Sequence, residues 1–137
     1  MIVVDTNIVV YLLSGDGPRA GLAAELLRHD PEWAAPPILP SELRNVLVGA
    51  VRRGLVRAED ALAMHDDAAL LLGARIAGVD GGAVTRTALE LGLSAYDAEF
   101  VVLARRLDVR LVTEDREILR AAPDVAMPLD GGSAESD

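Results

Sequence analysis

The sequence predicts an α/β protein, a three-layer α/β/α sandwich with a mostly parallel central sheet, from three observations. The length of 137 residues fits one compact domain. Hydrophobic residues make up 51% of the chain but aromatic residues only 3%, so the core is expected to be aliphatic. Short β-branched runs alternate with longer segments of helical periodicity, which is typical of parallel strands joined by helices.

The first half of the chain contains two predicted strands and four predicted helices. Ile2–Val4 is a β-branched run that ends at Asp5, which favours a buried strand. Residues 33–35 are expected to be extended because Pro36 and Pro37 exclude a helix there. Apolar residues at helical spacing predict helices over residues 8–13, 19–29, 40–53 and 57–72.

The second half continues the alternation. The pattern over residues 74–79 is ambiguous and is compatible with an extended segment. Helices are predicted over residues 82–91, 94–106 and 115–121, and strands over 109–113 and, at the sheet edge, 125–129. Ser94 is the expected N-cap of its helix. We expect one domain over residues 1–130 and a disordered tail over 131–137, which is rich in glycine, serine and acids.

Composition excludes several classes of function. With no cysteine, the chain has no disulfides, zinc–thiolate sites, iron–sulfur clusters or thiol nucleophiles. His29 and His65 are too few for most imidazole-based metal sites and are expected at the surface. The net charge of −9 argues against a simple basic nucleic-acid or membrane binder. No segment has the ~18 uncharged apolar residues of a membrane span, so we expect a cytoplasmic protein that does not enter a membrane.

Four carboxylates stand where a surface acid is not expected. Asp5 directly follows the first strand, and Asp115 lies at the end of the last clear strand. The carboxyl ends of parallel strands form the crevice where such sheets bind ligands. Asp97 shares a helical stripe with apolar residues, and Glu42 lies in the first turn of its predicted helix beside a buried leucine. The sequence therefore predicts an acidic cluster at one edge of the sheet.

Each of these acids also has an ordinary structural explanation. Asp5, Asp97 and Asp115 can cap helices or occupy their first turns, and Glu42 can complement a helix dipole. If the four converge, their charges must be neutralised by protons, arginines or a hard cation. Oxygen ligands alone favour Mg²⁺ or Mn²⁺, and four acids can hold two such ions. Glu99 is expected to point away from this cluster into solvent.

Four segments, quoted in chain order, carry a resemblance: Val3-Val4-Asp5-Thr6-Asn7, Ser41-Glu42, Ser94-Ala95-Tyr96-Asp97-Ala98 and Val112-Thr113-Glu114-Asp115. Together they resemble the PIN-domain ribonucleases, and most of all the VapC-type toxins of bacterial and archaeal toxin–antitoxin pairs. The similarity extends from residue 1 to about residue 129. Glu114 is an additional acid with no role in this pattern and is expected to be solvated.

The resemblance implies an α/β/α nuclease that uses Mg²⁺ or Mn²⁺ to hydrolyse RNA phosphodiester bonds with activated water. Asp5 and Asp97 would be direct metal ligands, with Glu42 and Asp115 completing the cluster. Thr6 or Asn7, and Thr113, would orient the carboxylates. The resemblance also implies a homodimer and a small antitoxin that blocks the site.

An acidic nuclease needs some cationic groups for RNA, because phosphate contacts normally supply most of the affinity. Arg44, Arg86 and Arg116 lie close in sequence to the motifs and are candidates for these contacts, although each is also explained as a surface ion-pair partner. A housekeeping RNA-processing nuclease and a non-catalytic PIN module that binds a protein remain alternatives. A phosphatase of the haloacid-dehalogenase type is disfavoured because Asn7 replaces its second aspartate and the chain has no lysine.

Overall fold

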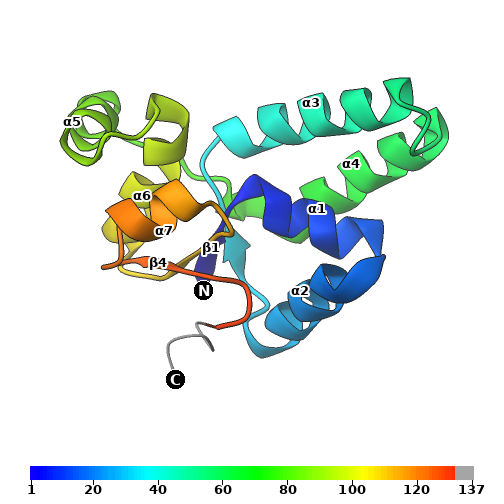
Figure 1. Ribbon diagram of the computed structural model, residues 1–137, viewed down its shortest axis with the longest axis horizontal. Coiled ribbons are helices and arrows are strands. Elements are labelled where there is room, and N and C mark those ends of the chain that lie inside the picture. The colour runs from blue at the N-terminus through cyan, green and yellow to red at the C-terminus, as the bar shows by residue number, and fades with distance from the viewer. Residues whose placement is uncertain (132–137) are drawn as a thin grey trace.

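The computed structural model describes residues 1–131, which form a four-stranded sheet in the order β2-β1-β3-β4 (Figure 1). The strands are β1 (Ile2–Val4), β2 (Trp33–Ala34), β3 (Leu111–Val112) and β4 (Ala126–Met127). All three strand pairings are parallel, which confirms the predicted fold class and places β4 at the edge. Gly131 closes a turn on the carbonyl of Pro128, and the rest of the predicted tail lies outside the described residues.

Helices surround this sheet in two groups, α1 to α4 on one side of Figure 1 and α5 to α7 on the other. Their bounds are α1 (Thr6–Ser14), α2 (Gly17–His29), α3 (Ile38–Arg52), α4 (Ala58–Leu72), α5 (Gly81–Leu91), α6 (Ala95–Leu107) and α7 (Arg116–Ala121), with a 3₁₀ turn at Gly73–Arg75. Within residues 1–131, no helix combines the length and apolar character needed to cross a membrane.

Several helices begin earlier than the apolar pattern predicts. α1 begins directly after Asp5, and α2 begins at Gly17 because Pro18 is well tolerated in a first turn. α3 begins at Ile38, so Glu42 lies in its second turn rather than its first. The ambiguous segment 74–79 is resolved by Ile76, which forms a single parallel bridge with Ala35.

α6 lies at the centre of the fold and is buried on more than one face. Phe100, Val101 and Leu103 belong to the main core around the sheet, and the helix contacts both β1 and β3. On another face, Val102 is buried with Val84 of α5 in a small second core. A helix that is enclosed in this way holds its polar residues in fixed positions, which matters for the acids of its first turn.

Candidate active site at the carboxyl edge of the sheet

The pairing of β1 with β3 fixes the centre of the site. Val4 lies opposite Val112, so the next residue of each strand, Asp5 and Thr113, meet at the carboxyl edge. Thr113 is fully buried, and its hydroxyl donates to Asp5 Oδ2 at 2.7 Å. The same hydroxyl oxygen accepts the backbone N–H of Asp115 at 3.0 Å. One threonine therefore orients the first predicted acid and positions the backbone of the last.

Asp5 is more deeply buried than Asp97. Its Oδ1 accepts the backbone N–H of Thr6 at 2.8 Å, so both carboxylate oxygens have donors. Burial nevertheless raises the pKa of Asp5 above its usual value, against the lowering effect of the Thr113 and Thr6 hydrogen bonds. The negative charges of Glu42 and Asp115 raise this pKa further. Asp5 is thus close to two of the acids with which the sequence grouped it.

Glu42 reaches the site from α3 through Thr6. The buried Thr6 hydroxyl donates to Glu42 Oε1 at 2.7 Å, which ties α1 to α3. The helix-dipole explanation of Glu42 loses force, because the dipole effect fades beyond the first turn and Glu42 lies in the second. Of the two predicted supporting residues in this segment, Thr6 makes the contact; Asn7 is exposed and makes no hydrogen bond within residues 1–131.

Asp97 lies in the first turn of α6. Ser94 caps this helix as predicted, its Oγ accepting the backbone N–H of Asp97 at 3.0 Å. The Ser94 side chain also hydrogen-bonds the Asp97 carboxylate, which lowers the pKa of Asp97 somewhat. Burial raises the pKa of Asp97, and the charges of Asp115 and Asp5 raise it further. The Asp97 carboxylate therefore lies close to Asp115 and Asp5 at the same edge.

Asp115 has two roles at once. Its Oδ1 accepts the N–H groups of Glu117 at 2.8 Å and Ile118 at 3.1 Å, which confirms the helix-cap explanation for this residue. Its charge also acts on both Asp5 and Asp97. Capping fixes the carboxylate without removing it from the cluster, so the two interpretations of Asp115 are compatible.

Two acids that were expected to be solvated are not. Glu99 is partly buried, and burial together with the charge of Glu42 raises its pKa. Helical periodicity does not predict the burial of Glu99, because it allows for one buried face of α6. In the structure α5 also covers the face that carries Val102. Glu114 accepts the N–H of Leu129 at 3.0 Å and lies 3.6 Å from the guanidinium of Arg19. Neither contact has a signal in the local sequence.

The chemistry of these donors fits a hard divalent cation. No salt bridge within residues 1–131 involves any of the four predicted acids, so arginine does not neutralise them. Carboxylate and hydroxyl oxygens are the ligands that Mg²⁺ and Mn²⁺ prefer. Over the same residues, no three acidic or histidine side chains already stand in the arrangement of a metal site. Binding would therefore require the carboxylates to draw closer together.

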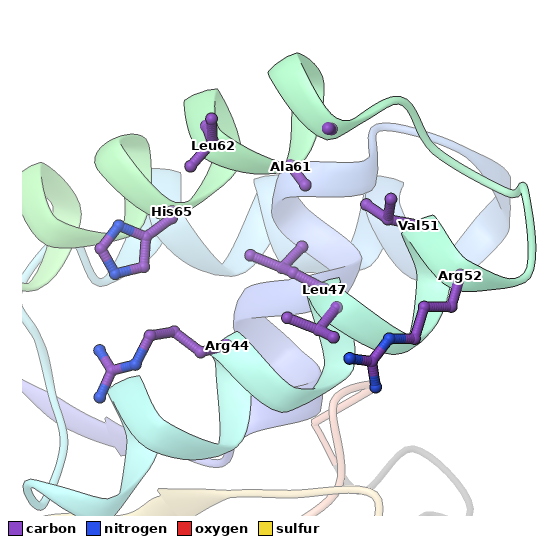
Figure 2. A pocket seen from close by; sticks show the side chains of 9 residues that line it. Arg44, Leu47, Val51, Arg52, Ala61, Leu62 and His65 are labelled. Atoms are coloured by element: carbon purple, nitrogen blue, oxygen red, sulfur yellow. The ribbon is translucent and has the colours of Figure 1, made fainter.

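A groove of about 460 Å³ lies elsewhere, between α3 and α4 (Figure 2). Leu47, Val51 and Leu62 supply apolar lining, and Arg44 and His65 also line the groove. His65 is half-buried here rather than fully on the surface, unlike His29, which is exposed.

The three arginines predicted to contact RNA belong to three different helices. Arg44 lines the α3–α4 groove and donates to Ser41 at 3.2 Å. The guanidinium of Arg86 lies close to Gly82 within α5. Arg116 is exposed at the first residue of α7, next to Asp115. Arg116 directly follows Asp115 in the sequence and is therefore the candidate bonded directly to one of the four acidic residues.

Comparison with known proteins identifies the family. A family model described as "PIN domain" matches residues 2–123. The chain belongs to the PIN domain family. PIN domains are generally nucleases and typically use divalent metal ions. No curated protein sequence matches this PIN domain.

Solved structures share the fold of this PIN domain at low sequence identity. PAE2754 from Pyrobaculum aerophilum is 22% identical, with a TM-score of 0.76 over 94% of this chain and 83% of that one. FitAcB from Neisseria gonorrhoeae is 17% identical, with a TM-score of 0.73 over 94% and 98%. A toxin–antitoxin complex from Klebsiella pneumoniae contains a chain 21% identical, with a TM-score of 0.66 over 93% and 97%.

Proposed function

We propose that this PIN domain is an endoribonuclease dependent on Mg²⁺ or Mn²⁺ and acts as the toxin of a toxin–antitoxin pair. The observation that carries the proposal is the edge where Asp5, Glu42, Asp97 and Asp115 approach one another, with raised pKa values at Asp5 and Asp97 and no salt bridge to arginine among residues 1–131. Similarity to the fold of known toxin–antitoxin proteins supports the toxin role.

In this proposal each residue has a defined task. Asp5 and Asp97 would bind the cation directly, and Glu42 and Asp115 would complete the cluster. Thr113 and Thr6 hold Asp5 and Glu42 through their 2.7 Å hydrogen bonds. The cation supplies Lewis-acid chemistry, which activates water and neutralises charge on the phosphoryl group. No protein nucleophile is required, in agreement with the absence of cysteine.

Purified protein tested on single-stranded RNA with Mg²⁺ or Mn²⁺ decides this proposal. We expect cleavage that leaves 5′-phosphate ends, is abolished by chelator and falls at least about 100-fold in Asp97→Asn. Asp67→Asn is the matched control, because Asp67 is exposed on α4, and it should leave the rate unchanged. Absence of cleavage with either metal would favour the non-catalytic alternative, a PIN module that binds a protein.

The toxin role is tested separately in cells. Expression should arrest growth in the cytoplasm of a host, and a small protein encoded next to this chain should relieve the arrest. We propose that the antitoxin blocks the acidic edge and that the protein assembles as a homodimer. Cleavage of RNA without growth arrest would instead favour a housekeeping nuclease.

A further inference from the structure

A second cavity opens beside the acidic edge, between the end of α5 and helix α7. Its volume is about 350 Å³. Its lining comes from Leu91, Gly92, Leu93, Glu117, Arg120 and Ala121. The walls are apolar except for Glu117 and Arg120, so a flat ligand with hydrogen-bonding edges suits the cavity better than a small ion does.

This cavity adjoins the proposed active site through both of its walls. On one side, Leu93 immediately precedes Ser94, the cap that holds the first turn of α6 and hence Asp97. On the other side, the backbone N–H of Glu117 donates to Asp115. The negative charge of Glu117 also raises the pKa of Asp97. A group bound in the cavity would therefore lie next to the acids proposed to act on the phosphodiester.

The two charged side chains of the cavity are available to a ligand. Glu117 and Arg120 are three residues apart on α7 and both are exposed, yet within residues 1–131 neither side chain forms a salt bridge or hydrogen bond. A carboxylate accepts two hydrogen bonds side by side, and a guanidinium donates a fork. A phosphate is a poor occupant because Glu117 would repel it, whereas a base with adjacent donors and adjacent acceptors fits both groups.

We propose that this cavity binds a guanine base of the RNA substrate and so selects where the chain is cut; the inference rests on the proposed function. Guanine is the base that places two donors, N1–H and the N2 amino group, next to each other, and these match the Glu117 carboxylate. Its O6 and N7 acceptors are the usual partners of an arginine fork, here Arg120. Leu91, Leu93 and Ala121 would contact the faces of the ring, as apolar side chains do for bases of single-stranded RNA.

Titration with mononucleotides, followed by nuclear magnetic resonance, tests the inference without any cleavage. We expect guanosine monophosphate to shift the signals of Leu93 and Ala121, and to bind about tenfold more tightly than adenosine or inosine monophosphate. Inosine lacks only the N2 amino group. Glu117→Gln should remove the preference for guanosine over inosine. Glu90→Gln makes the same charge change on an exposed residue of α5 outside the cavity, and should preserve it.

The outcomes separate the inference from the proposed function. Equal binding of the nucleotides, no binding at millimolar concentrations, or an unchanged preference in Glu117→Gln would each overturn the inference, even if the protein cleaves RNA. Selective binding of guanosine monophosphate without cleavage of any RNA would uphold the guanine site but refute both the nuclease proposal and the role of this site in selecting the cut. Selective binding together with cuts mapped beside guanines would support both.

Discussion

The Thr113 hydroxyl offers the sharpest test of how the site is built. It is fully buried, donates to Asp5 and accepts from the backbone of Asp115. Thr113→Val preserves the shape of the side chain but removes both hydrogen bonds. The Asp115 N–H would then be left without its acceptor, and the Asp5 carboxylate would lose one donor. Both losses occur in a site from which water is largely excluded.

The magnitude follows from the kinds of bond removed. A hydrogen bond to a charged group contributes roughly 1.5–3 kcal/mol, and a neutral one about 1 kcal/mol. We therefore expect Thr113→Val to lower the free energy of unfolding by about 2–4 kcal/mol, a large share of the ~5–15 kcal/mol typical of a domain. Urea denaturation measures this as a lower midpoint with an unchanged slope.

Two further threonines calibrate the measurement. Thr6→Val removes one hydrogen bond to Glu42 and should cost about 1.5–3 kcal/mol. Thr85→Val removes an exposed bond to the carbonyl of Gly81 within α5 and should change stability by no more than about 0.5 kcal/mol. If Thr113→Val lowers the free energy of unfolding as little as Thr85→Val does, the Thr113 hydroxyl does not join Asp5 to the segment between β3 and α7. The proposed role of Thr113 in positioning the acids would then be wrong.

Three other predictions follow from the acidic residues. In chelator, Asp97→Asn should raise the free energy of unfolding by roughly 0.5 kcal/mol, because it relieves repulsion from Asp115 and Asp5. Calorimetry should show weaker Mn²⁺ binding by this variant, and lower stability in chelator would contradict the prediction. The pKa values of Asp5 and Asp97 are raised in the folded state, so the metal-free protein binds protons more tightly when folded than when unfolded. Protonation of these two groups therefore increases the free energy of unfolding as the pH falls through their folded-state pKa values toward about 4. The excess free energy of unfolding of Asp97→Asn over the wild type should therefore decrease between about pH 7 and about pH 4. An excess that increased over this range would contradict the prediction. Glu114→Ala should cost about 1–2 kcal/mol in thermal or urea unfolding by leaving the Leu129 N–H unpaired, whereas Glu114→Gln keeps an acceptor and should cost less.

Local patterns were sufficient for the order of the elements and the place of the acids. A β-branched run that stops at an aspartate marks the carboxyl end of β1 whatever follows it, and Ser94 caps α6 as its residue type predicts. Because parallel strands align their carboxyl ends, the sequence predicts Asp5 and Asp115 at one edge of the sheet, and β1 does pair with β3 in parallel.

Helix starts and the environments of single residues were harder to predict. The start of α3 was placed too late, and Glu42 with it, because the apolar stripe does not mark the turn before its first buried residue. Glu99 was assigned to solvent because a periodicity argument allows one buried face, whereas α6 packs on both the sheet and α5. Glu114 binds Leu129 and lies near Arg19, residues distant in sequence.

The α/β fold, the acidic character of the sheet edge and the candidate residues can be predicted from the amino-acid sequence, because they depend on residue type and on spacing along a single strand or helix. The partners of individual acids depend on the tertiary structure, which pairs Thr113 with Asp5 and Thr6 with Glu42. Only the tertiary structure revealed the cavity between α5 and α7. Contacts of this kind depend on how helices pack across long stretches of chain, and no local pattern of residues encodes that packing.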